Sequence, residues 1–197
     1  MLHFSNTEIA FGAKKPKDLR RAYWLFKVVS YPWIVKLAKR ITPWMLRMGL
    51  PIKGIIKATI FKQFCGGETI DECNARIEEL GRFGVGTILD YSVEGKTTDD
   101  DFEETTRIII STIEKAKNAP NIPFAVFKVS GIGRFDLLEK ASDLSLTPDT
   151  HCQEEINTVK RRFARICEAA AQHNVRLFID AEETWIQPVL DAWTLEM

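Results

Sequence analysis

From about residue 60 onward, short apolar runs alternate with longer amphipathic stretches. The apolar runs are residues 60–65, 85–91, 123–129 and 175–180. Helix-like spacing of apolar positions is found in residues 70–83, 99–117, 150–173 and from 184 onward. Short apolar runs are typical of strands, whereas a period of about 3.6 residues is typical of helices, so the pattern predicts four successive βα units.

The polar residues at the expected helix ends agree with this division. Thr69 precedes the first of these helices, and Asp71 and Glu72 fall in its first turn. Side-chain oxygens of this kind accept hydrogen bonds from the free N–H groups of a helix start, and acidic groups are favourable there. We therefore expect the helix to begin at about residue 70.

The third apolar run indicates a parallel sheet. Residues 123–129 are apolar apart from Lys128, as in strands that are buried on both faces. The spacing of the units fits a (βα)8 barrel, but a complete barrel needs eight units and about 250 residues. We therefore expect an α/β fold in which residues 60–197 form about four βα units, the N-terminal part of a TIM-like barrel. Because half a barrel leaves open strand edges, we expect the chain to be a fragment, to dimerise or to continue past Met197.

Residues 1–59 are expected to form a basic helical arm. Its helices should break at Pro32, Pro43 and Pro51, because proline lacks the N–H that a helix interior uses. Aromatic residues lie among its cations: Tyr23, Trp24, Phe26, Tyr31, Trp33 and Trp44. We favour packing of these rings on the rest of the chain, while contact with a membrane surface or with nucleic acid remains open.

The charges of the chain are balanced overall but separated along it. The 27 basic and 27 acidic residues give a formal net charge of +0, which provides no general attraction to nucleic acid. Residues 1–60 nevertheless hold 12 Lys or Arg and only two acidic residues. No apolar run is long enough to cross a bilayer, and neither a signal sequence nor a paired cysteine motif is visible among the four cysteines. These features favour a reduced, cytoplasmic protein.

Three ionisable residues follow or end the predicted strands. They are Glu94 after the second strand, Lys128 at the end of the third and Asp180 at the end of the fourth. In parallel barrels the catalytic groups project from these carboxyl ends. The apolar neighbours of Lys128 would desolvate its charge unless an anion faces it, and Asp180 on the adjacent strand is the expected partner. An ion pair that serves only stability, or caps on the following helices, would explain the same placement.

Other polar and glycine motifs do not indicate a metal or nucleotide site. His3, His151 and His173 lack the spacing of zinc ligands, and the acidic residues 99–101 suit a solvated helix start, so we expect no metal site. The glycines of residues 84–86 precede a strand, whereas a nucleotide-binding loop follows one.

Four segments in order resemble proline dehydrogenase, and in particular its single-function enzymes. They are Phe64-Cys65-Gly66-Gly67-Glu68-Thr69, Thr87-Ile88-Leu89-Asp90-Tyr91-Ser92-Val93-Glu94, Phe127-Lys128-Val129-Ser130-Gly131 and Leu177-Phe178-Ile179-Asp180-Ala181-Glu182-Glu183-Thr184-Trp185-Ile186-Gln187-Pro188. The resemblance implies a flavoenzyme that oxidises L-proline to Δ1-pyrroline-5-carboxylate, the first step of proline degradation to glutamate. It further implies that FAD accepts a hydride and that a membrane quinone takes the electrons. Such an enzyme would be peripheral at the inner membrane, and mitochondrial in a eukaryote.

The resemblance also assigns roles to residues. Lys128 matches the position that binds the substrate carboxylate, and Asp180 matches a pocket aspartate that orients this lysine. The backbone at Ala181 would lie near the flavin, while Glu94 would hold a substrate-binding arginine from beyond Met197. The flavin performs the hydride chemistry, and the protein contributes orientation and electrostatics.

Part of the family pattern is absent from the 197 residues. The later strands and a last helix with a Tyr-x-x-Arg-Arg motif do not occur, so we expect the N-terminal half of an enzyme whose intact gene product is active. Two other functions remain open: a non-catalytic half barrel that docks on a membrane or a partner, and a lyase that forms a Schiff base through Lys128.

Overall fold

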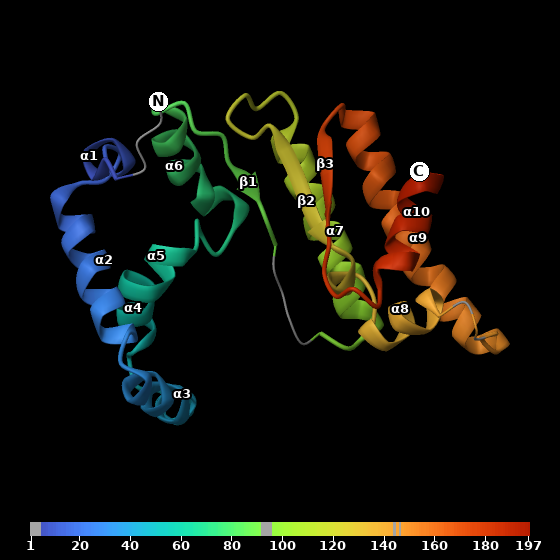
Figure 1. Cartoon of the computed structure of the whole chain (residues 1–197), viewed down its shortest axis with the longest axis horizontal. Helices are drawn as coiled ribbons and strands as arrows, with labels where there is room; N and C mark the ends of the chain where they lie inside the picture. Colours follow the sequence, from blue (N-terminus) through green and yellow to red (C-terminus); the bar gives the residue numbers. More distant parts are fainter. Residues whose placement is uncertain (1–4, 92–95, 144, 146) are drawn as a thin grey trace. The chain divides into compact units, whose positions relative to one another are not determined.

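The computed structural model describes residues 5–91, 96–143, 145 and 147–197. The chain forms two compact units, Met1–Phe83 and Gly84–Met197. Figure 1 shows the helices of the first unit and the small sheet with its helices in the second. The division of the chain between residues 59 and 60 stays a prediction.

The first unit is helical throughout its described part. Its elements are α1 (Thr7–Ala10), α2 (Pro16–Val29), α3 (Pro32–Arg47), α4 (Lys53–Ile56), a π-helical turn η1 (Lys57–Phe61), α5 (Lys62–Phe64) and α6 (Ile70–Gly81). The prediction of basic helices is therefore confirmed, as is the start of α6, where the Thr69 side chain accepts a hydrogen bond from the N–H of Glu72 at 3.2 Å. Ile77, 7% exposed, is the one buried hydrophobic residue among those described in this unit.

The predicted strand over residues 60–65 is wrong. These residues continue the helical stretch that begins with α4, through η1 and α5. Ile56, Ile60 and Phe64 are spaced four residues apart and so share a helix face, a period that the compact apolar run concealed. The ring of Phe64 meets that of Phe26 on α2 edge to face, with centroids 6.0 Å apart, so this face packs on the neighbouring helix.

The predicted helix break at Pro43 is also wrong. Pro32 begins α3 as expected, but Pro43 lies inside this helix. Its missing N–H leaves one carbonyl of the preceding turn without an intrahelical partner. Because α3 has no buried residue, water can solvate that carbonyl, and the helix continues to Arg47. The break near Pro51 is confirmed, since Gly49 ends the helix with a φ of +71°.

The second unit contains a parallel sheet in the order β1 (Ile88–Leu89), β2 (Phe124–Lys128) and β3 (Arg176–Asp180). Between and after the strands lie α7 (Asp99–Ala116), a 3-10 turn η2 (Val129–Gly131), α8 (Phe135–Ser142), α9 (Thr150–His173) and α10 (Gln187–Glu196). The mixed α/β class and three of the four predicted strands are thus confirmed, together with helices α7, α9 and α10. The sequence reading missed α8, which is a single short helix with Leu137 and Leu138 buried.

The four helices that the structure describes in this unit pack on one face of the sheet. Ala125 and Phe127 of β2 belong to one buried cluster with residues of α7, α8, α9 and α10. The alternate residues of the strands point to the other face, because side chains alternate along a strand. On that open face the rings of Phe124 and Phe178 stack with centroids 4.5 Å apart, and Phe178 is 46% exposed.

Arg162 ties α9 to α7. Its side chain is 4% exposed and donates to Asp99 Oδ1 at 2.6 Å, to Glu103 Oε2 at 3.2 Å and to the carbonyl of Ile132 at 3.3 Å. Hydrogen bonds from Arg165 and then Arg162 hold the pKa of Glu103 below its ordinary 4.5. The stability that this carboxylate contributes is therefore present above that pH and lost as the pH falls through its folded pKa.

Among the described residues, no helix combines the length and apolar character that crossing a membrane requires.

Candidate active site

Lys128 and Asp180 lie side by side at the carboxyl edge of the sheet. Lys128 ends β2 and Asp180 ends β3, and the two residues form the last paired row of these parallel strands. Paired residues of parallel strands point to the same face, so both side chains lie on the open face. Lys128 Nζ donates to Asp180 Oδ2 in a salt bridge. The structure thus brings this predicted pair together, while the catalytic roles of the two residues stay predictions.

The pair is more accessible than the apolar neighbours of Lys128 suggest. The side chain of Lys128 is 38% exposed and that of Asp180 is 45% exposed. The helices cover the opposite face, where Phe127 and Val129 are buried, so the charged groups keep contact with solvent. A ligand that enters from the open face can therefore reach them.

The charges of three carboxylates favour the protonated form of Lys128. The hydrogen bond from Lys128 to Asp180 is the largest cause of a pKa above the ordinary 10.5, and the charges of Asp180, Glu182 and Asp90 act in the same direction. Lys128 is therefore a cation at neutral pH. A lysine that forms a Schiff base must instead lose its proton readily, which makes Lys128 a better anion-binding group than a nucleophile.

The structure adds Glu182 to the site, a residue of the last family-like segment for which the sequence predicts no role. Glu182 Oε2 accepts a hydrogen bond from the backbone N–H of Ser130 at 3.0 Å, and Oε1 accepts one from the Ser130 hydroxyl. Ser130 lies two residues after Lys128, and Glu182 lies two residues after Asp180. Because each residue lies two positions after the end of its strand, the equal spacing indicates that Ser130 and Glu182 could meet.

The other predicted site residues have different outcomes. Glu94 lies outside the described residues, so its predicted role as a substrate-binding residue stays a prediction. Ala181 follows β3 directly and is exposed, and its predicted place beside a flavin stays a prediction. In the described part of the chain, no group of three or more His, Cys, Asp and Glu side chains is arranged to hold a metal ion.

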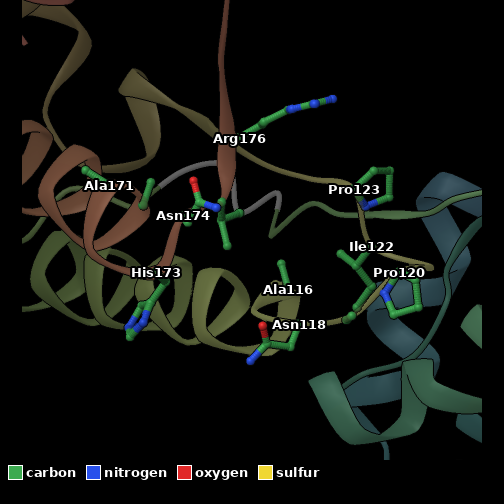
Figure 2. Close-up of a pocket in the computed structure, with 12 residues that line it drawn as sticks. Ala116, Asn118, Pro120, Ile122, Pro123, Ala171, His173, Asn174 and Arg176 are labelled. Atoms are coloured by element: carbon green, nitrogen blue, oxygen red, sulfur yellow. The ribbon is translucent and has the colours of Figure 1, made fainter.

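A pocket of about 650 Å3 lies at the opposite edge of the sheet (Figure 2). It is lined by Pro123 and Arg176 near the amino ends of β2 and β3, and by the last residues of α7 and α9, including His173. Asn174 closes α9 in a left-handed conformation with φ +54°. In βα barrels this edge serves stability, whereas chemistry takes place at the carboxyl edge.

A groove of about 1140 Å3 lies within the first unit, and its lining includes charged residues of α2, η1 and α6. Three of its cations already have carboxylate partners: Arg21 binds Asp18, Lys57 binds Glu68 and Glu72, and Arg76 binds Glu79. The strand-end pair lies at the carboxyl edge of a parallel sheet, where βα proteins place their chemistry, and is for this reason the better candidate for an active site.

Comparison with known proteins identifies the family of the chain. The family model described as proline dehydrogenase matches residues 73–197, a range that includes both strand ends. The carbapenem antibiotics biosynthesis protein CarD of Pectobacterium carotovorum is 29% identical over 82% of this chain and 43% of its own length. Mitochondrial proline dehydrogenase 1 of Dictyostelium discoideum is 25% identical over 96% of this chain and 40% of its own length. Hydroxyproline dehydrogenase of Xenopus laevis is 22% identical over the whole chain and 49% of its own length. The chain therefore spans less than half the length of each of these relatives.

Proposed function

This chain belongs to the proline dehydrogenase family, and from that membership we propose that the protein oxidises L-proline to Δ1-pyrroline-5-carboxylate with FAD. The observation that carries the proposal is the Lys128–Asp180 pair, which ends two adjacent parallel strands inside the matched region. A zwitterionic amino acid needs a cation for its carboxylate and anions near its amine. Lys128 with its surrounding carboxylates supplies both kinds of charge.

The sheet is proposed to be part of the wall of a (βα)8 barrel. Two observations support this: the strands are parallel, and the helices of this unit pack on one face. A doubly wound sheet carries helices on both faces, whereas a barrel keeps them outside and fills its interior with side chains. In the barrel interpretation, Phe124 and Phe178 on the open face point into the interior.

Lys128 is proposed to bind the carboxylate of proline. Its ammonium group has three N–H donors, and Asp180 accepts from one of them. The remaining donors can bind a carboxylate oxygen that approaches from the open face. The raised pKa of Lys128 keeps this charge present throughout the neutral range.

Asp180 is proposed to orient Lys128 and to favour the charged amine of the substrate. Asp180, Glu182 and Asp90 all act on Lys128, so the site carries an excess of negative charge before the substrate binds. A substrate that brings both a carboxylate and a cationic ring nitrogen compensates these charges better than a simple carboxylate does.

The residues of the open face fit a flavin. Ala181 has a small, exposed side chain beside the pair, and the stacked rings of Phe124 and Phe178 offer an apolar surface for a planar ring system. When bound, FAD would supply the hydride acceptor. Ala181 would contact it through its backbone, with Lys128 and Asp180 holding the substrate beside it. A membrane quinone would be the electron acceptor, and the protein itself would lie in the bacterial cytoplasm, at the inner membrane, or, for a eukaryotic source, in the mitochondrion.

The function is tested by proline-dependent dye reduction with the protein that contains this chain. We expect a yellow protein with flavin absorption that reduces an artificial acceptor only when L-proline is present. Trapping of Lys128 with borohydride and a carbonyl substrate, without proline-dependent reduction, would overturn this and support the Schiff-base lyase. Failure of both assays would leave the non-catalytic binding module.

The helical arm is proposed to contact an anionic membrane surface, where a quinone would be found. Tyr23 and Trp24 on α2 are 60% and 59% exposed, and Trp33 and Trp44 on α3 are 65% and 59% exposed. Lys27 Nζ lies 5.1 Å from the centre of a Trp24 ring, so cations and aromatic rings occupy one surface. Aromatic rings with basic residues beside them suit the interface of an anionic bilayer.

We expect the protein to sediment with vesicles that contain phosphatidylglycerol and to remain in solution with pure phosphatidylcholine. Replacing Trp33 with alanine should weaken sedimentation, because that ring would leave the bilayer interface. Trp185 is 53% exposed in the other unit, and Trp185→Ala is the matched control that should behave as wild type. Equal binding of the wild type and Trp33→Ala would contradict a role of α3 at the membrane.

A further inference from the structure

We propose that Glu182 is a positioning residue that holds the loop after β2 in register with the loop after β3, and so fixes Lys128 for its substrate. This inference rests on the proposed function and extends it to a residue that does not itself touch the substrate.

Glu182 continues the pairing of the two strands beyond their last backbone row. Lys128 and Asp180 are 52 positions apart in sequence, and so are Ser130 and Glu182. On adjacent parallel strands, residues 130 and 182 would form the next row on the same face. The backbone of η2 turns away at this point, and the Glu182 carboxylate spans the gap with two hydrogen bonds to Ser130.

The contact is suited to fixing the position of a loop. Because Glu182 accepts from both the backbone N–H and the hydroxyl of Ser130, it restrains the main chain as well as the side chain. A carboxylate that accepts two hydrogen bonds forms stronger bonds than a neutral acceptor does. On the other side of the loop, Val129 is 0% exposed and packs in the core. Val129, which follows Lys128, is thus held by the core, and Ser130 is held by Glu182.

The same carboxylate acts on Lys128 through space. The charge of Glu182 favours the protonated ammonium group, although the direct hydrogen bond goes to Asp180. Loss of Glu182 would therefore remove a restraint on the backbone beside Lys128 and also one negative charge near its ammonium. Both effects alter how the cation is presented to a substrate carboxylate, and neither alters the hydride acceptor.

The test measures kcat and KM for L-proline in the protein that contains this chain. Glu182→Ala should raise the KM by about tenfold, the effect of one lost charged hydrogen bond, with kcat within about twofold of wild type. Glu182→Gln keeps one carbonyl acceptor and should have a smaller effect. Ser130→Ala loses only the hydroxyl and should raise the KM by about threefold. Glu183→Ala, an exposed neighbour, is the control that should leave both constants unchanged.

A second measurement distinguishes positioning from general stability. The dissociation constant of a non-reacting cyclic carboxylate, measured by quenching of protein fluorescence, should rise in parallel with the KM, while the urea midpoint of Glu182→Gln stays near that of wild type. In a double-mutant cycle, Ser130→Ala should add little once Glu182 has been replaced. Wild-type KM in Glu182→Ala would overturn the inference, and so would a loss of activity that follows only the loss of folded protein.

Different outcomes contradict the proposed function and the positioning role of Glu182. Absence of any proline-dependent reduction in the wild type would contradict the proposed function. A raised KM in Lys128→Met together with an unchanged KM in Glu182→Ala would leave that function standing and contradict the positioning role alone.

Discussion

Lys128→Met should raise the KM for L-proline by about 10- to 150-fold, because a hydrogen bond to a charged group contributes about 1.5–3 kcal/mol. Methionine has a similar length and no charge, so the substitution removes the cation with little change of shape. The substrate carboxylate would then enter a site where Asp180, Glu182 and Asp90 face it without a cation. Steady-state kinetics with varied proline would measure the effect.

Lys160 provides a matched control for this substitution. It also forms an ion pair with a carboxylate, that of Glu196, but it lies on α9, away from the strand ends. Lys160→Met should leave the KM within about twofold of wild type, because Lys160 lies away from the strand ends. Loss of its ion pair should change the free energy of unfolding by only about 0–1 kcal/mol. An unchanged KM in Lys128→Met would show that the carboxylate binds elsewhere. A fall in kcat at constant KM would place the role of Lys128 in the transition state alone.

Phe163→Ala should lower the free energy of unfolding by about 3–5 kcal/mol, the usual cost of deleting a buried aromatic ring. Phe163 is 0% exposed and lies between two other rings. It meets Phe127 of β2 edge to face with centroids 5.4 Å apart, and Trp193 of α10 at 5.7 Å. The truncation would leave a cavity at the place where α9 joins the sheet to α10. Urea unfolding followed by circular dichroism would measure the loss.

Two further variants show whether the effect comes from this packing. Phe163→Leu keeps much of the apolar volume and should be less destabilising than Phe163→Ala. Phe83→Ala removes the same ring from a side chain that is 55% exposed and should change the free energy by no more than about 0.5 kcal/mol. Equal losses in Phe163→Ala and Phe83→Ala would contradict the assignment of the core.

The second unit could be read largely from its sequence because its local signals agree with one another. Helix α9 runs from Thr150 to His173 as predicted, with Asp149 accepting from the N–H of Cys152 at 2.8 Å at its start. Strands β2 and β3 lie within the predicted runs. In these elements the apolar pattern and the expected period indicate the same structure, and in α9 the cap agrees with them.

The errors occur where a local signal was ambiguous or weak. The apolar run over residues 60–65 is compatible with a strand or with a helix. In the helical form Phe64 contacts Phe26 on α2, a helix that is far away in sequence. Pro43 is tolerated because α3 is solvated, a property of the packing that composition does not reveal. Helix α8 is a single short segment. The burial of its two leucines depends on the core that they join, which the sequence does not show.

The sequence by itself determined the α/β class, the family, and the placement of Lys128 and Asp180 at strand ends, because periodicity and motif order are local properties of the chain. Only the tertiary structure decided that these side chains form an ion pair on the open face of the sheet, and that Glu182 reaches Ser130 beyond the last backbone row. Each of these contacts joins residues 52 positions apart. Such contacts depend on the register of two strands, which the hydrogen bonds of the folded sheet establish.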